Sequence, residues 1–132
     1  MSNLETVRQI YAAFGRGDIS AFLEQLDQGV DWEYGSGSNE VPWLQPRRGR
    51  EAAAGFFEAL REVEIHRFVP KELLEGPDLV VALVDIEFTV QRTGRRVIEE
   101  DEAHVWRFNS RGKVERFRHC TDTLQNSDAW RG

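Results

Sequence analysis

The order of two hydrophobic periodicities constrains the fold of this chain more than any other feature of its sequence. Early in the chain, apolar residues recur every three to four positions, which predicts three helices, over 3–15, 18–28 and 50–62. Later they alternate with period two, which predicts long strands, over 65–76, 79–91, 97–109 and 113–122. Short turns between these strands favour an antiparallel meander. We therefore expect a two-layer α+β domain, with the helices covering one face of a mostly antiparallel sheet of four to six strands.

The length and charge of the chain exclude several classes of protein. Its 132 residues suit a single domain, which we expect to span 1–132. The formal net charge of −6 argues against nucleic-acid and membrane partners, because anionic surfaces are bound by clustered Lys and Arg. No apolar run is long enough to span a membrane, no signal peptide is visible, and Cys120 is the only cysteine. We expect a cytoplasmic protein without an internal disulfide.

Two histidines lie in the last two predicted strands, and alternation places both on the inner face of the sheet. His119 shares a side with Phe117, and His104 shares a side with Trp106, whereas arginines take the opposite side of the last strand. Counting outward from the turn at 110–112 puts His119 one diagonal step from His104, within about 7 Å. The pair is either an acid–base cluster or two hydrogen-bonded histidines of a half-polar core.

The same alternation places Glu100 and Glu102 on the His104 side. Carboxylates on an inner face are costly unless they are paired or hydrated. Either a β-bulge or a solvated strand end resets the alternation there, or the inner face opens into the polar mouth of a cavity. Both alternatives remain open at the level of the sequence.

Aromatic residues are numerous enough to line a cavity as well as to fill a core. The candidates for a ligand-binding wall are Tyr11, Phe14, Trp32, Tyr34, Trp43, Phe56, Phe88 and Trp106. A metal site at His104, His119 and Glu102 is a rival interpretation of the polar residues. The chain has neither closely spaced Cys and His ligands nor two His one helical turn apart, so we expect no metal and no cofactor.

Four segments carry a family resemblance when they are taken in order. They are VRQIYAAFGRGDISAFLEQL (7–26), VDWEY (30–34), GREAAAGFFEAL (49–60) and WRFNSRGKVERFRHCTD (106–122). The chain resembles the SnoaL-like and ketosteroid-isomerase-like proteins of the nuclear-transport-factor-two-like superfamily. This resemblance implies a curved sheet wrapped round three helices, forming a cone with an internal pocket. It also implies a homodimer formed through the outer face of the sheet.

The resemblance also implies roles for single residues. SnoaL-type polyketide cyclases place an acidic acid–base residue on the last strand, and the matching position is His119, followed three residues later by Asp122. A histidine can serve as a general base near neutral pH. The catalytic positions of ketosteroid isomerases fall on Ile10, Tyr34 and His104, so we do not expect that activity. Relatives of limonene-epoxide hydrolase need an Asp–Arg–Asp set, and no inward arginine is evident.

Two hypotheses from different classes follow. The first is a cofactor-independent isomerase, cyclase or hydrolase of an apolar cyclic or polyketide-like compound, with catalytic residues His119, His104, Asp122 and Glu102. The second is a non-catalytic module for binding an apolar ligand or for dimerisation. In both cases we expect a homodimer whose outer-face contacts are apolar residues, Val81, Leu83 and Val105, and charged residues, Arg107, Arg118, Asp85 and Glu87.

Overall fold

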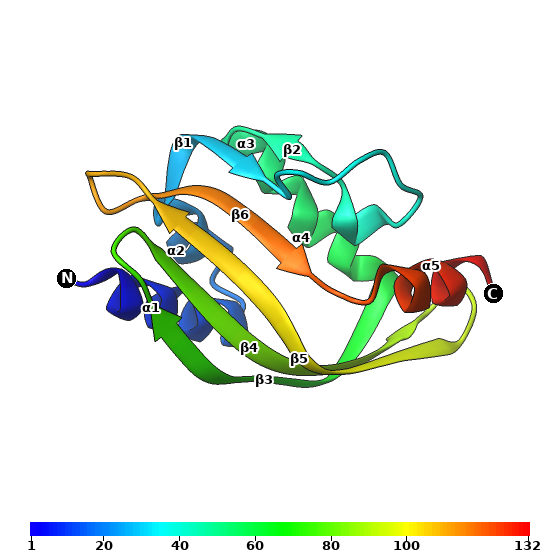
Figure 1. Ribbon diagram of the computed structural model, residues 1–132. Coiled ribbons are helices and arrows are strands. Elements are labelled where there is room, and N and C mark those ends of the chain that lie inside the picture. Colours follow the sequence, from blue (N-terminus) through cyan, green and yellow to red (C-terminus); the bar gives the residue numbers. More distant parts are fainter.

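The computed structural model describes all 132 residues and has the expected α+β architecture, with helices inside a curved sheet (Figure 1). Six strands form one sheet in the order β2-β1-β6-β5-β4-β3. All neighbouring strands are antiparallel except β1 and β6, which are parallel. The first long strand, β1, thus lies beside the last strand, β6, and β2 and β3 form the two edges of the sheet.

The elements follow one another along the chain with these bounds. They are α1 (Asn3–Gly15), α2 (Ile19–Glu24), β1 (Leu26–Trp32), the 3-10 turn η1 (Pro42–Leu44), β2 (Arg47–Arg48), α3 (Arg50–Ala53), α4 (Gly55–Ala59), the 3-10 turn η2 (Leu60–Glu62), β3 (Val63–Glu75), β4 (Leu79–Val90), β5 (Arg95–Phe108), β6 (Val114–Cys120) and α5 (Thr123–Arg131).

Helix α1 matches its predicted bounds because both of its ends are specified locally. The side chain of Ser2 caps it by accepting a hydrogen bond from the backbone N–H of Glu5 at 3.0 Å. Helix α2 is likewise capped by Asp18, but it ends at Glu24 and not near 28. Leu26 begins β1, since the backbone carbonyl before it accepts from the N–H of Val114 on β6. Pairing with the sheet here overrides the helical periodicity of the sequence.

Helix α5 is absent from the sequence prediction. Its N-terminus is capped by the side chain of Asp122, which accepts from the backbone N–H of Gln125 at 3.0 Å. The helix buries Asn126, which accepts a hydrogen bond from the indole Nε1–H of Trp43 at 2.9 Å. A helix held largely by polar contacts, with few apolar residues, gives no clear stripe, which is why periodicity missed it.

A β-bulge in β5 settles the question of the two inner glutamates. One extra residue of β5 lies between Glu99 and Glu102, and Asp101 takes a left-handed conformation with φ of 61°. The bulge resets the alternation, so Glu100 is exposed whereas Glu102 is 6% exposed. Only one of the two glutamates therefore faces the interior.

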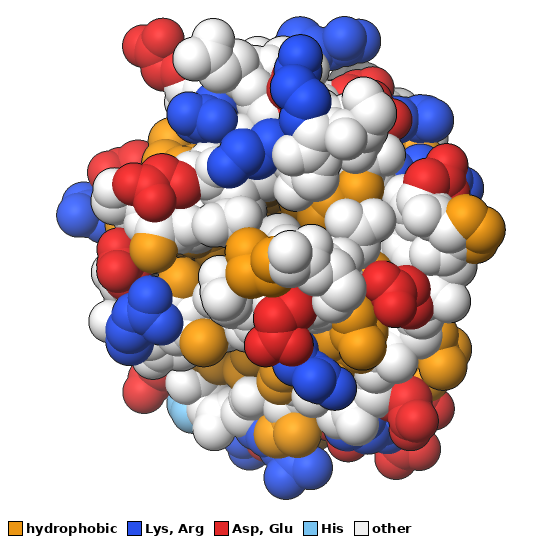
Figure 2. Space-filling view, turned by 90° about the vertical axis from the view of Figure 1, so that its left-hand side faces the viewer, with side chains coloured by type: hydrophobic (Ala, Val, Ile, Leu, Met, Phe, Trp, Pro, Cys, Tyr) orange, Lys and Arg blue, Asp and Glu red, His pale blue; other side chains and the backbone are white.

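In the view of Figure 2, acidic and basic side chains are interspersed with hydrophobic ones. None of the helices combines the length and the hydropathy that crossing a bilayer requires. On the outer face of the sheet, Asp85 pairs with Lys71 at 2.8 Å, and Glu87 pairs with Arg96. The acidic groups expected to serve a dimer contact are thus already paired within the chain.

We propose that an apolar patch on this outer face pairs two chains. Val81 lies opposite Val105 in the register of β4 and β5, and on its other side lies Leu74, which is 53% exposed. Val81→Glu should convert a dimer to a monomer in light scattering, because it places a charge within the patch. Leu124→Glu, on exposed α5, is the matched control and should leave the mass unchanged. A wild-type chain that is monomeric at micromolar concentration contradicts the proposal.

Candidate functional site

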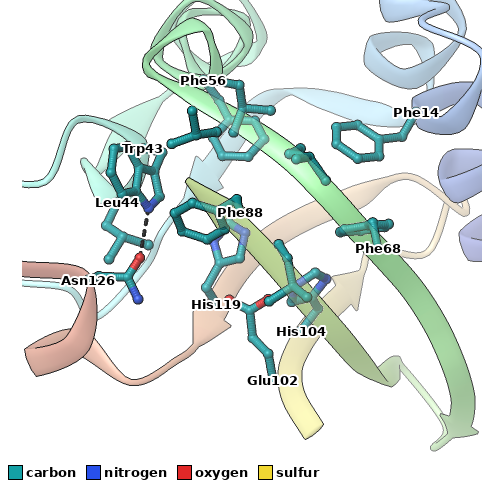
Figure 3. A pocket seen from close by; sticks show the side chains of 14 residues that line it. Phe14, Trp43, Leu44, Phe56, Phe68, Phe88, Glu102, His104, His119 and Asn126 are labelled. Atoms are coloured by element: carbon teal, nitrogen blue, oxygen red, sulfur yellow. Dashed lines mark hydrogen bonds and ion pairs between the residues drawn. The ribbon is translucent and has the colours of Figure 1, made fainter. Parts of the chain in front are cut away.

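Two adjoining hollows lie between the helices and the inner face of the sheet, and Figure 3 shows the side chains that line the first of them. The volume that the centre of a water molecule can occupy is about 40 Å³ in one hollow and about 30 Å³ in the other. Both are lined by Phe14, Phe56, Phe68, His104 and His119, so they form one apolar cavity. Glu102 is the only acidic residue on its wall.

The aromatic residues selected from the sequence line this cavity, with one exception. Those that do are Tyr11, Phe14, Trp32, Trp43, Phe56, Phe88 and Trp106. Tyr34 does not, and its assignment to the ligand-binding wall is wrong. Its ring lies on the outer side of the sheet, 4.0 Å from the guanidinium carbon of Arg116 and 5.4 Å from that of Arg118.

The cause of this error is the backbone at Glu33, which has a left-handed φ of 62°. The left-handed residue ends the alternation of β1, so Trp32 and Glu33 are both buried and Tyr34 turns outward. The backbone N–H groups of Glu33 and Tyr34 both donate to the carbonyl of Phe117 on β6, at 2.6 and 3.2 Å. Glu33, which alternation assigns to the outside, therefore reaches the interior.

Glu33 is bound to His119 through both of its carboxylate oxygens. Oε1 accepts the backbone N–H of His119 at 2.7 Å, and Oε2 lies 2.6 Å from the imidazole Nδ1. Glu33 is 2% exposed. Burial by itself lowers the pKa of His119, but the charge and hydrogen bond of Glu33 outweigh it and raise the pKa above the ordinary value. The other ring nitrogen, Nε2, has no hydrogen-bond partner in the protein and belongs to a cavity-lining side chain.

His104 is held at both ring nitrogens. The indole Nε1–H of Trp106 donates to the hydroxyl oxygen of Tyr11 at 3.0 Å, and the hydroxyl lies 2.6 Å from Nδ1 of His104. The Tyr11 hydroxyl thus donates its own hydrogen to Nδ1, which assigns the neutral imidazole proton to Nε2. That Nε2–H donates to Oε2 of Glu102 at 3.1 Å.

The pKa of each group in this network follows from its surroundings. Burial lowers the pKa of His104, which keeps the ring neutral. Burial also raises the pKa of Tyr11 far above its ordinary value, which keeps its hydroxyl a donor. At Glu102 burial acts to raise the pKa, but the hydrogen bond from His104 and the charge of His119 bring it below the ordinary value. The cavity wall thus combines a neutral imidazole with one that holds its proton.

The two imidazoles are close, with ring centroids 4.8 Å apart. His104 and His119 lie directly opposite each other, and not on the diagonal that the sequence predicts. The register of β5 and β6 shifts by one residue near Phe108, which moves the pair into line. Their facing positions place both rings on the same wall.

Asp122 does not belong to this site, and its assignment as a catalytic residue is wrong. The residue is exposed, lines neither hollow of the cavity, and its carboxylate caps α5. The carboxylate that pairs with the charged His119 is that of Glu33 and not that of Asp122. No sequence signal marks Glu33, because a left-handed glutamate cannot be recognised from its neighbours.

The residues that could hold a metal ion are Glu102, His104 and His119, whose ligand atoms lie within 4.8 Å of one another. An ion there would replace the direct hydrogen bond between His104 and Glu102. It would also need His119 as a neutral ligand, whereas Glu33 favours its charged form. The donor set therefore fits proton chemistry better than metal binding.

The fold and the enclosed cavity define a member of the nuclear-transport-factor-two-like (NTF2-like) superfamily. Residues 7–117 match the family model described as a SnoaL-like domain, so the chain belongs to the SnoaL-like family. No curated protein matches the chain.

Solved structures support the same assignment. An NTF2-like protein of unknown function from Burkholderia pseudomallei is 27% identical, with a TM-score of 0.85 and full coverage of both chains. An NTF2-like protein from Burkholderia thailandensis is 26% identical, with a TM-score of 0.83 over 98% of this chain and 97% of its own. TerC, co-crystallised with polyporic acid, is 24% identical, with a TM-score of 0.76 over 98% of each chain.

Glu33→Gln tests the electrostatic description of the site. Loss of the adjacent negative charge should lower the pKa of His119, because an opposite charge at hydrogen-bond distance favours the protonated ring. The pKa is measured by NMR titration of the imidazole resonances. Glu100→Gln removes an exposed carboxylate and should leave the titration of His119 unchanged. Equal pKa values in wild type and Glu33→Gln contradict the description.

The two histidines should affect stability in opposite pH ranges. The folded chain holds the His119 proton more tightly than the unfolded chain does. The stability that this proton contributes is therefore fully present below about pH 6.5 and is lost as pH rises through the raised pKa. The contribution of His104, whose folded pKa is lowered, is lost as pH falls below about 6.5. Urea unfolding of His119→Gln and His104→Gln across pH should show these opposite slopes relative to wild type. Parallel slopes for both variants are incompatible with the assignment.

Proposed function

We propose that this chain is a cofactor-independent enzyme that moves a proton on an apolar cyclic compound, with His119 as the acid–base residue. The observation that carries the proposal is the state of its ring. Nδ1 is bound to buried Glu33, and Nε2 is left without a protein partner on the wall of an apolar cavity. A histidine oriented by a carboxylate at one nitrogen and free at the other has the arrangement of a general acid or base.

The proton inventory of such a step is simple. His119 as imidazolium donates the Nε2 proton to a ligand atom and becomes neutral. The neutral ring then accepts a proton from the ligand and returns to its starting state. Isomerisation and ring closure both need such a transfer with no net change in the protons of the enzyme. Glu33 stabilises the charged form of the ring in each cycle.

The Tyr11–His104–Glu102 chain supports this step without taking the proton itself. Both nitrogens of His104 are engaged, so the ring has no free position for a ligand proton. Its hydrogen bond keeps Glu102 ionised on the cavity wall, and that negative charge raises the pKa of His119 further. We assign His104 and Tyr11 as positioning residues for Glu102.

Two features of the wall bear on the ligand. The surface is mostly aromatic, which favours a flat apolar ring system. Trp32 lines the cavity, and its buried Nε1–H has no acceptor in the protein. A buried donor without a partner is costly, and an oxygen atom of a ligand would satisfy it. An oxygen-bearing cyclic compound of polyketide type fits both features.

The present size of the cavity requires adjustment for such a compound. About 40 Å³ and about 30 Å³ of room hold a few water molecules and no aromatic ring. Phe14 and Phe68, which line both hollows, are only partly buried, so a rotation of their rings would widen the cavity. TerC, which has the same fold, was co-crystallised with polyporic acid, and that compound is a suitable first probe.

The alternative is a module that binds an apolar ligand without changing it. The narrow cavity favours it, because about 40 Å³ and about 30 Å³ leave little room to position a substrate for reaction. The two functions differ in what His119 contributes: a binding module needs only its shape, whereas an enzyme needs its proton.

His119→Ala separates the two functions. It should reduce turnover of a substrate found by screening cyclic ketones and quinones by about 10²-fold or more, the usual contribution of a general acid–base group. His66→Ala, a substitution of an exposed histidine on β3, is the control and should retain full activity. Full turnover by His119→Ala would contradict the role of His119, and no turnover of any screened compound by the wild-type chain would leave only the binding function.

A further inference from the structure

A second hollow lies on the other side of His119, open to solvent. It is a polar cleft of about 250 Å³ between the loop after β1, the end of β6 and helix α5. Its lining is Glu33, Ser36, Gly37, Ser38, Asn39, Val41, Leu44, Arg118, His119, Thr121, Thr123 and Ser127. His119 and Leu44 line both this cleft and the apolar cavity. The two hollows therefore meet at the proposed acid–base residue.

Arg118 supplies a positive charge to this cleft that nothing in the chain neutralises. It forms no ion pair with an acidic side chain, and its Nε–H is buried without an acceptor. Glu33, the acidic residue of the cleft, is bound to His119 and not to Arg118. In a chain with a net charge of −6, a partly buried guanidinium without an acidic partner is a site for an external anion.

The guanidinium is also held in place before any ligand arrives. It lies against the ring of Tyr34. Gly35 permits this packing, because a Cβ there would lie 2.9 Å from Nη1 of Arg118. A fixed guanidinium loses little conformational entropy when it binds a carboxylate, which favours affinity.

Hydroxyl groups around the cleft complete the set of donors. The side chains of Ser36, Ser38, Thr123 and Ser127 line the cleft, and none makes a side-chain hydrogen bond within the protein. A rotatable hydroxyl can donate to a carboxylate oxygen that the planar guanidinium does not reach. Because the charges of His119 and Glu33 offset each other, the cleft offers one unpaired cation, Arg118, and several neutral donors, which suits a group with a single negative charge.

We propose that this cleft binds the carboxylate of an amphipathic organic acid whose ring system enters the apolar cavity. The inference rests on the proposed function for the ring and on Arg118 for the carboxylate. His119, at the junction, then lies beside the bond between the apolar ring and its polar substituent. The substrate class is accordingly a cyclic or aromatic carboxylic acid and not a neutral ring compound.

The probes are benzoate and its neutral amide, benzamide, which share a ring and differ in charge. Binding is measured by NMR titration, with the Nε–H resonance of Arg118 as the local reporter. Benzoate should shift this resonance and bind about ten-fold or more tightly than benzamide, because a hydrogen bond to a charged group contributes about 1.5–3 kcal/mol. Arg118→Gln should abolish the preference and leave the weak binding of benzamide unchanged.

Arg116→Gln is the matched control. Arg116 lies on the same strand and against the same Tyr34 ring, but it is exposed and outside the cleft. This variant should keep the preference for benzoate. Equal affinity for the two probes, no binding of either at millimolar concentration, or an equal loss in both arginine variants overturns the inference.

Titration with inorganic phosphate tests whether the cleft binds an inorganic anion and not an organic acid. If phosphate shifts the Arg118 resonance at lower concentration than benzoate does, the cleft is an inorganic anion site and the organic-acid assignment is wrong. The outcomes are separate from those for the proposed function. If the chain does not prefer benzoate but its turnover depends on His119, only the cleft is rejected. If His119→Ala keeps full turnover and the preference for benzoate remains, only the role of His119 is rejected.

Discussion

The buried pair of Glu33 and His119 is the interaction on which the site depends. It joins the end of the first strand to the end of the last, and it uses both a backbone and a side-chain group of His119. Removing one partner of a buried charged pair costs about 3–5 kcal/mol, because the other charge is left without compensation. The pair therefore holds β1 against β6 and sets the protonation of the ring at the same time.

The contrast between the two histidines gives the cavity its chemistry. They are neighbours on adjoining strands with similar burial, yet their pKa values move in opposite directions. Each ring has a carboxylate partner, Glu102 for His104 and Glu33 for His119. At His104 burial outweighs the hydrogen bond and charge of Glu102, whereas at His119 the charge and hydrogen bond of Glu33 outweigh burial. Environments that separate two titrations in this way are typical of acid–base sites.

The sequence predicts those parts of the fold that follow from regular periodicity. The stripe of α1 and the apolar face of β4 are read correctly, and so is the inward direction of His104 and His119, because each lies within an unbroken element. The errors occur where periodicity stops. Glu33 ends the alternation of β1 with a left-handed residue, and that one backbone angle exchanges the expected positions of Glu33 and Tyr34. Such a conformation is an exception for glutamate, so no propensity scale anticipates it.

The two carboxylates of the site lie beside irregular backbone. Glu102 faces inward by alternation from His104, and the bulge at Asp101, which has a left-handed φ, places Glu100 outside. Glu33 is itself left-handed. Each such non-glycine residue costs about 1–3 kcal/mol of backbone strain. Burial of the carboxylates adds a desolvation cost, and leaving both outside would avoid it. A regular continuation of β1 would place Glu33 in water. The left-handed residue instead directs its carboxylate to His119, and the stability of the fold alone gives no reason for that arrangement. The strain at Glu33 is explained if the fold holds this carboxylate for the protonation state of the cavity.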